Sequence, residues 1–121
     1  MSTQILIVED DADVRDTMVQ VLESEGFSVC ATRDGREALD VLRAGLRPGL
    51  ILLDLMMPVM NGWQFRAGTE RDPELASIPV VLVSALDPGT ERTASIAAAG
   101  FLHKPFDLDD LLGVVQRAVA A

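Results

Sequence analysis

The sequence predicts an α/β protein with a doubly wound, five-stranded parallel sheet and five helices. Short apolar runs alternate along the chain with longer segments whose apolar residues recur at helical spacing. Three of the runs, residues 5–8, 50–53 and 80–83, are aliphatic at every position, which is typical of strands buried on both faces of a parallel sheet. Because strands and helices alternate, right-handed crossovers should place helices on both faces of the sheet.

In the first half of the chain, the pattern predicts three strands and two helices. In order, we expect a strand at 5–8, a helix at 12–25, a strand at 27–31, a helix at 35–44 and a strand at 50–53. Both helices carry their apolar residues on one face, and each is followed or stopped by a glycine, Gly26 and Gly45. Cys30 lies in the apolar second strand, which predicts a buried thiol.

The second half of the chain continues the alternation. In order, we expect a helix at 62–71, a strand at 80–83, a helix at 90–99, a strand at 101–103 and a helix at 107–119. Gly68 weakens the first of these helices, and Asp72-Pro73 should end it. The second is rich in alanine and should close at Gly100. The third begins with acidic residues, as the helix dipole favours.

Length and composition predict one domain over residues 1–121, with no tail leading into an effector domain. The net charge of −9 argues against direct binding to nucleic acid. No apolar run is long enough to span a membrane, and the N-terminus lacks the layout of a signal peptide. A single cysteine excludes an internal disulfide, so we expect a cytoplasmic protein.

Polar side chains follow four of the five predicted strands at the point where each strand ends. Glu9 and Asp10 follow the first strand, Asp54 the third, Ser84 the fourth and Lys104 the fifth. The carboxyl ends of parallel strands meet at one edge of the sheet, where open α/β sheets bind their ligands. Lys104 is the only lysine in the chain, which makes its position at a strand end more informative.

Three carboxylates at one edge repel each other, so one would take up a proton unless a cation is bound. Oxygen ligands of this kind suit Mg²⁺, which usually keeps water and substrate phosphate in its shell. The strand ends carry no plausible serine–histidine pair, but a carboxylate can itself attack a phosphoryl group. Ser84 and Lys104 could then bind phosphoryl oxygens and offset their charge.

Simpler interpretations exist for several of these residues. Acidic residues before a helix can act as caps, and this is the more plausible role for Asp11. Capping does not account for Asp54, whose own alternative is to start a turn. His103 is better explained as a surface or half-buried strand residue than as a phosphodonor or metal ligand.

At these positions the sequence resembles the receiver domain of two-component response regulators, in particular single-domain regulators of the chemotaxis type. The resemblance rests on IVEDD at 7–11, LDLMMP at 53–58 with NG at 61–62, VSA at 83–85 and KPF at 104–106. Each piece is weak alone, but the four in this order and at these separations are highly specific. The resemblance implies a flavodoxin-like fold with strand order 2-1-3-4-5.

The resemblance also implies what the site residues do. Asp54 would accept a phosphoryl group from a histidine kinase or a phosphotransfer protein. Mg²⁺ would be bound directly by Asp10, through water by Glu9, and by Asp54 and the backbone carbonyl of Met56. Ser84 would supply the hydroxyl that moves toward the phosphoryl group, with Lys104 as its ion-pair partner. In relatives, the bond corresponding to Lys104–Pro105 is commonly cis.

The implied function is a signalling switch rather than an enzyme with a separate substrate. The domain would catalyse only its own phosphorylation and dephosphorylation, and Phe101 occupies the place of the switching aromatic ring. Its output would be protein–protein contacts through the face formed by the fourth helix, fifth strand and fifth helix. We expect a monomer or a weak, phosphorylation-dependent dimer, either as a stand-alone regulator or as part of a larger protein.

The chain departs from the family pattern at two places, and two competing functions fit it less well. Met56 and Leu86 are apolar where many fast-hydrolysing relatives are polar, and the stretch before Phe101 lacks a common acidic residue. A phosphatase of the haloacid-dehalogenase type would need an aspartate at position 56 as general acid. A flavodoxin-like FMN carrier would need phosphate donors where the chain has Glu9-Asp10-Asp11, which would repel the phosphate.

Overall fold

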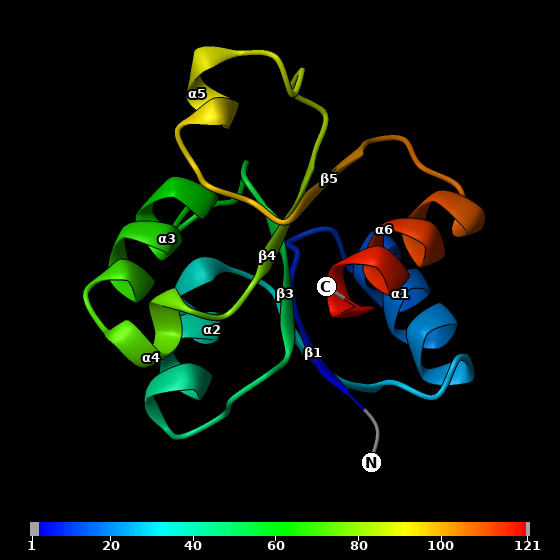
Figure 1. The fold of residues 1–121 in the computed structure, drawn as a ribbon, viewed down its shortest axis with the longest axis horizontal. Coiled ribbons are helices and arrows are strands. Elements are labelled where there is room, and N and C mark those ends of the chain that lie inside the picture. The colour runs from blue at the N-terminus through cyan, green and yellow to red at the C-terminus, as the bar shows by residue number, and fades with distance from the viewer. Residues whose placement is uncertain (1–2, 121) are drawn as a thin grey trace.

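A five-stranded parallel sheet forms the centre of the structure, a computed structural model that describes residues 3–120 (Figure 1). Its strands are β1 (Gln4–Val8), β2 (Ser28–Thr32), β3 (Leu50–Asp54), β4 (Val80–Ser84) and β5 (Gly100–His103). They lie in the order β2-β1-β3-β4-β5 and every neighbouring pair is parallel. The predicted fold class and strand order are confirmed. Residues 1–2 and 121 of the predicted domain lie outside the described residues.

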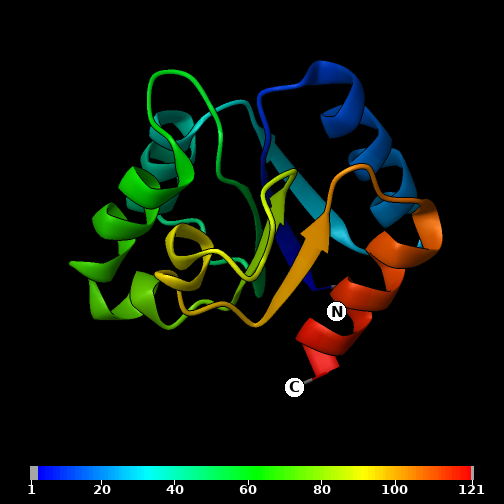
Figure 2. The ribbon, with the colours of Figure 1, turned by 90° about the horizontal axis from the view of Figure 1, so that it is seen from above.

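Helices cover both faces of the sheet. They are α1 (Ala12–Ser24), α2 (Gly35–Arg43), α3 (Gly62–Glu70), α4 (Pro73–Ala76), α5 (Glu91–Ala94) and α6 (Leu108–Ala120). α1 and α6 lie on one face, and the other four lie on the opposite face (Figures 1 and 2). None of the helices within residues 3–120 is long and apolar enough to cross a membrane.

Side chains of the central strands alternate between two apolar clusters, as the period of two in a β-strand requires. On the side of α1 and α6, the strand residues are Ile5, Ile7, Leu50, Leu52, Val81 and Val83. On the other side they are Leu6, Val8, Ile51, Leu53, Val80 and Leu82. Both faces of these strands are therefore buried, which explains why their sequences are aliphatic at every position.

The edge strand β2 is less buried than the central strands. Cys30 lies on it and is half-buried, so the prediction of a buried thiol was wrong. Only β1 pairs with β2, and its other edge carries no neighbouring strand within the described part of the chain. Partial burial still raises the pKa of the Cys30 thiol, with a smaller contribution from Glu37.

Within the described residues there is one helix more than the five predicted, because a short helix follows the predicted break at Asp72-Pro73. α3 does end at Glu70, before the proline. Asp72 then accepts a hydrogen bond from the backbone of Glu74 (3.0 Å) and caps α4, with Pro73 in its first turn. Proline is favoured there because the first helical residue needs no N–H donor.

The predicted helix at 90–99 is also shorter than expected. α5 contains only Glu91–Ala94, so the prediction that the helix continues to residue 99 was wrong. The backbone N–H of Ala99 donates instead to the Val80 carbonyl (2.8 Å), at the point where β5 begins to pair with β4. The predicted fourth and fifth helices therefore correspond to α5 and α6.

Candidate functional site

The structure brings the polar residues of four strand ends together at one edge of the sheet. Glu9 and Asp10 follow β1, Asp54 ends β3, Ser84 ends β4 and Lys104 follows β5. The strand register places the ends level, because Asp54 pairs with Val83 and Ser84 pairs with His103. Glu9, Asp54 and Ser84 are buried, whereas Asp10 is exposed.

A tight loop between β3 and α3 holds Asp54 in place. The backbone N–H of Gly62 donates to the Leu55 carbonyl (3.0 Å), closing the loop on the strand end. Asn61 caps α3 and exchanges hydrogen bonds with Gln64 in a capping box. One carboxylate oxygen of Asp54, Oδ1, accepts a hydrogen bond from the backbone of Met56 (3.2 Å). Asp54 therefore does help to form the turn, as the simpler interpretation suggested, and it also belongs to the cluster of strand-end residues.

Gly62 has no room for a side chain, so Gly62→Ala should disturb this loop. A Cβ atom there would lie 2.8 Å from both the Asp54 carbonyl oxygen and the Leu55 Cα. Both are backbone atoms that cannot rotate away, so we expect a loss of about 1–3 kcal/mol in the free energy of unfolding. Chemical denaturation measures it. Gly89→Ala is the control because its Cβ would meet only the Asp87 side chain at 3.6 Å. Equal stability of the two variants would show that the loop can make room for a methyl group.

Lys104 sits between the two buried carboxylates. Its Nζ lies 2.6 Å from Oε1 of Glu9 and 3.3 Å from Oδ2 of Asp54. The lysine donates a hydrogen bond to Asp54, but its contact with Glu9 is not aligned as one. Glu9 Oε1 consequently has no hydrogen-bond donor among the described residues. One lysine thus faces two buried carboxylates, which leaves excess negative charge at the strand ends.

This excess appears in the pKa values of the three groups. Burial raises the pKa of Glu9 from 4.5 to about 7, despite the opposing effect of Lys104. Burial also raises the pKa of Asp54, against opposing contributions from Glu9 and Lys104. For Lys104, burial lowers the pKa, but the two carboxylates outweigh it and the net shift is upward. Without a further cation the pair of carboxylates therefore tends to retain a proton, as expected from the sequence.

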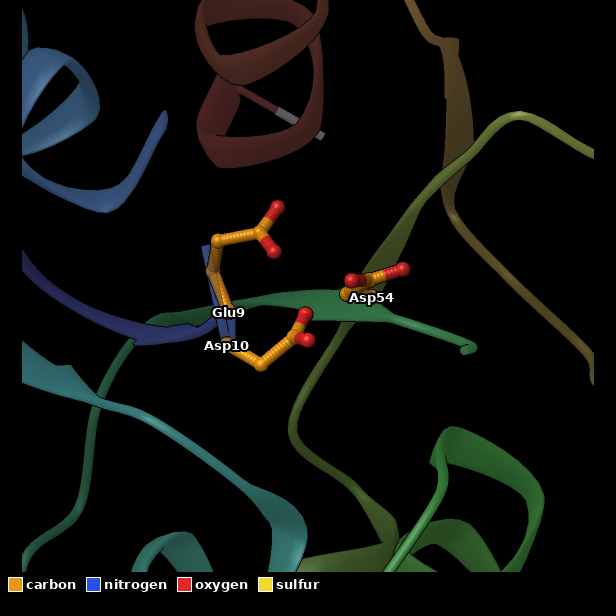
Figure 3. A group of neighbouring side chains, drawn as sticks. All are labelled: Glu9, Asp10 and Asp54. Carbon is orange, nitrogen blue, oxygen red and sulfur yellow. The ribbon is translucent and has the colours of Figure 1, made fainter. Parts of the chain in front are cut away.

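The three acidic residues fit a divalent cation. One carboxylate oxygen from each of Glu9, Asp10 and Asp54 lies within 4.8 Å of the other two. Figure 3 shows their carboxyl groups gathered at the ends of β1 and β3. An all-oxygen donor set of this kind suits a hard ion such as Mg²⁺.

Arg15 is a residue of this site that the sequence analysis missed. From α1 its Nη1 donates to the Glu9 carbonyl (3.0 Å) and makes a longer contact with the Asp10 carbonyl (3.5 Å). It therefore fixes the backbone that carries both acidic side chains. The available signal was a basic residue one turn into a helix that directly follows an acidic run. Asp11 caps α1 through the backbone N–H groups of Asp13 and Val14, in its expected role.

The remaining predicted residues connect the site to β4 and β5. Ser84 is fully buried, and its Oγ accepts a hydrogen bond from the backbone of Leu86 (3.0 Å). Phe101 is half-buried on β5, with its ring centroid 6.3 Å from that of the exposed His103. The Lys104–Pro105 peptide bond is cis, as the resemblance led us to expect.

Comparison with known proteins decides the family. The family model for the response regulator receiver domain matches residues 5–116. The chain belongs to this family. Receiver domains act in two-component signalling, in which they interact with histidine kinases, and the family binds Mg²⁺ in its active site.

Relatives of this receiver domain include longer regulators. It is 36% identical to the alkaline phosphatase synthesis transcriptional regulatory protein SphR of Synechococcus elongatus, covering 92% of this chain and 46% of SphR. It is 38% identical to the response regulator MprA of Mycobacterium tuberculosis, covering 93% of this chain and 48% of MprA. The chain thus spans about half the length of these curated relatives.

Solved structures of similar fold include single receiver domains. The chemotaxis response regulator CheY4 of Vibrio cholerae superposes with a TM-score of 0.90 at 28% identity, covering 98% of this chain and 99% of CheY4. The receiver domain of the Pseudomonas aeruginosa sensor histidine kinase PA1611 has a TM-score of 0.90 at 24% identity, with each chain covered fully (100%). That structure is described as having a magnesium ion coordinated in its active site cleft. At this identity the likeness shows the fold.

Proposed function

We propose that this receiver domain accepts a phosphoryl group on Asp54 and signals its phosphorylation state through protein–protein contacts. The observation that carries the proposal is the contact of Lys104 with two buried carboxylates at the strand ends, which leaves one charge uncompensated. A divalent cation would offset this negative charge and the further negative charge of an incoming phosphoryl group. Helix capping or turn formation alone would not require these two acids to be buried beside one lysine.

The residues divide the chemistry among them. A carboxylate oxygen of Asp54 attacks the phosphorus atom, forming a P–O bond as the bond to the donor breaks and the leaving group takes its electron pair. Glu9, Asp10, Asp54 and the Met56 carbonyl would hold Mg²⁺, which offsets the charge of the transferring group. Ser84 ends β4, the strand next to that of Asp54, and the Lys104 Nζ lies 3.3 Å from Asp54 Oδ2, so both would bind phosphoryl oxygens.

A protein phosphodonor, either a histidine kinase or a phosphotransfer protein, fits the surroundings of the site. A hollow beside Lys104 is lined mainly by the apolar side chains of Val14, Ala85, Pro105 and Phe106, with Asp13 and Thr17 of α1 also on its wall. It lies between α1 and the segment that joins β5 to α6. Partners of this kind act in the cytoplasm, where we propose that this domain works.

The output surface that we propose is the face formed by α5, β5 and α6. Its link to the site is short, because the Lys104 N–H donates to the Ser84 carbonyl (2.8 Å) where β4 and β5 end. Phe101 lies on β5 within this face. The net charge of −9 favours a protein partner over direct binding of nucleic acid by this domain. We expect a monomer or a weak dimer that depends on phosphorylation.

Labelling with acetyl phosphate tests the proposed function. The protein should form an acyl phosphate with Mg²⁺ present and fall to background when a chelator removes the metal. Added Mg²⁺ should also raise the midpoint of thermal unfolding, because it binds the folded state. Labelling that is equally fast without a divalent cation would contradict the metal's proposed role.

The raised pKa of Glu9 predicts that Mg²⁺ binding depends on pH. With a pKa of about 7 in the folded protein, against 4.5 ordinarily, Glu9 keeps its proton at pH 6 and loses it at pH 8. Mg²⁺ must displace that proton, so its affinity should be about tenfold weaker at pH 6 than at pH 8. Calorimetric titration at both values measures this. Glu9→Gln should flatten the pH dependence, and an unchanged dependence in that variant would assign it to another group.

The raised pKa of Glu9 also determines how the free energy of unfolding depends on pH when no metal is bound. Between about pH 4.5 and 7 the folded protein holds a proton that the unfolded chain has lost. The contribution of Glu9 to stability is therefore greatest below this window. It declines as pH rises through about 7, and above that value Mg²⁺ binding should oppose the loss.

The phosphoryl group on Asp54 should be long-lived. Hydrolysis needs a water molecule aligned with the phosphorus atom, and Met56 and Leu86 offer no strong hydrogen-bonding group to hold one. The Met56 side chain is 56% exposed and can extend over the approach to the site. We expect Met56→Asn plus Leu86→Glu to lose the phosphoryl group faster than wild type after the donor is removed. Equal decay rates, or slower decay in the double variant, would show that these positions do not control water access.

A further inference from the structure

α5 ends after one turn although its sequence favours continuation. The residues after it include Ala97, Ala98 and Ala99, and alanine has the highest helix propensity. The N–H groups of Ala94 and Ser95 donate to the carbonyls four residues earlier, as in a regular helix. The next bond in the series would join the Ile96 N–H to the Arg92 carbonyl. Ile96 donates instead to Thr93 (3.3 Å), which tightens the turn and ends the helix.

The Arg92 carbonyl is already occupied by two side chains. It accepts a hydrogen bond from the indole Nε1 of Trp63 (2.9 Å) and another from the hydroxyl of Ser95 (2.6 Å). A carbonyl oxygen has two lone pairs, so these two donors use its capacity. Trp63 lies on α3 and also stacks under the Arg92 guanidinium, whose Cζ is 4.4 Å from the ring centroid. The hydrogen bond from the Trp63 indole to the Arg92 carbonyl is the contact that competes with the helix, and we call this bond the Trp63–Arg92 clasp.

We propose that the Trp63–Arg92 clasp holds α5 in a short form, and that its release lets the helix extend to about residue 98. In the extended form the Arg92 carbonyl accepts the Ile96 N–H, and the alanines join the helix. The inference rests on the proposed function, because phosphorylation of Asp54 is the event that we expect to release the clasp. The proposal names α5 and the residues that follow it, up to about residue 98, as the part of the α5–β5–α6 face that would move.

Chain geometry connects the length of α5 to the site. The far end of the segment is fixed, because the Ala99 N–H donates to Val80 where β5 begins. A residue advances about 3.3 Å in extended chain and about 1.5 Å in a helix, so each residue added to the helix shortens the segment by about 1.8 Å. This length must come from residues 85–90, which directly follow Ser84 and are mostly exposed. Residues 85–90 must therefore change conformation both when Ser84 moves toward a phosphoryl group and when α5 extends.

The local hydrogen bonding of Ser84 supports this connection. Its hydroxyl accepts the N–H of Leu86, the second residue of the connecting loop. A hydroxyl that turns toward a phosphoryl group gives up that bond and frees the start of the loop. At the other end, Thr93 and Ile96 are buried, so extension of α5 must shift these two side chains within the core. The exposed residues between Ser84 and Thr93 can take up the change in length.

Substitution of Trp63 tests the clasp in the unmodified protein, without Mg²⁺ or phosphodonor. Trp63→Phe keeps an aromatic ring but removes the N–H donor, and Trp63→Leu removes both. In each variant we expect the Cα chemical shifts of residues 95–98 to move in the helical direction. Exchange of the Ile96 amide should slow by about fivefold. Arg92→Gln is the matched control, because it removes the guanidinium and leaves the carbonyl and the indole. It should leave residues 95–98 unchanged.

Unchanged shifts at residues 95–98 in both Trp63 variants would overturn the proposal, as would helix extension in Arg92→Gln equal to that in Trp63→Phe.

A separate comparison uses wild-type protein whose phosphorylation is verified by mass. Residues 95–98 should then become helical and the emission of Trp63, the only tryptophan, should shift. Verified phosphorylation without either change would overturn the coupling. A failure of labelling would count against the proposed function. The unphosphorylated Trp63 variants would still show whether the clasp limits the length of α5.

Discussion

Replacement of Asp54 by asparagine is expected to abolish Mg²⁺-dependent phosphorylation while the fold survives. The amide has nearly the same shape as the carboxylate, but it lacks the anionic oxygen that attacks phosphorus. Its single carbonyl oxygen can keep the hydrogen bond from the Met56 backbone, which Oδ1 now accepts, and gives up the one from Lys104, which Oδ2 now accepts. Removal of one buried negative charge also relieves repulsion with Glu9, so the pKa of Glu9 should fall toward its ordinary value.

The measurement is incubation with acetyl phosphate and Mg²⁺, followed by intact-protein mass, together with thermal unfolding of the same samples. Asp11→Asn is the matched control, because Asp11 lies beside the cluster but its side chain caps α1. Asparagine also caps helices well, so this control should be labelled at the wild-type rate. Undiminished labelling of Asp54→Asn would contradict the assignment of Asp54 as the acceptor.

Lys104→Arg is expected to separate phosphorylation from signalling. Lysine places a compact ammonium 2.6 Å from Glu9 and 3.3 Å from Asp54, in a position where its side chain is only 22% exposed. Arginine keeps the charge but presents a wide planar fork, which cannot occupy the same point between the two carboxylates. The charge should still support phosphoryl transfer. The displaced group should fail to draw Ser84 and Phe101 into their signalling positions.

The readout is the change in NMR chemical shifts over α5, β5 and α6 when the protein is phosphorylated. Wild type should show this change, and Lys104→Arg should be phosphorylated without it. Arg117→Lys is the control, because it makes the opposite exchange, arginine to lysine, at an exposed position of α6. It should behave as wild type. A full wild-type shift of the α5–β5–α6 face in phosphorylated Lys104→Arg would defeat the idea.

The sheet and the strand-end residues could be predicted because one physical constraint dictates both. A strand buried on both faces of a parallel sheet needs apolar residues at every position, so its end is marked where the first polar residue appears. Asp54 and Ser84 are recognisable in this way, since each ends an uninterrupted aliphatic run. The topology then brings these ends together with no information beyond the order of the elements.

The features that the sequence did not reveal depend on partners that are distant or ambiguous. Under our proposal α5 stops because Trp63, 29 residues away, bonds to the Arg92 carbonyl, and no local pattern encodes that contact. Asp72-Pro73 marks both the end of one helix and the start of another, and only the start of α4 was missed. Arg15 reaches back to the carbonyl of Glu9, and a basic residue on an amphipathic helix is by itself usually a surface residue.

Direct mapping of the phosphoryl group tests the central claim most sharply. Borohydride reduces an acyl phosphate to an alcohol, which would convert a phosphorylated aspartate into homoserine that peptide mass spectrometry can locate. After incubation with acetyl phosphate and Mg²⁺, we expect homoserine at position 54 and unmodified side chains at Glu9 and Asp10. Reduction at Glu9 or Asp10 in place of Asp54, or at no carboxylate in a protein that has gained a phosphoryl group, would contradict it.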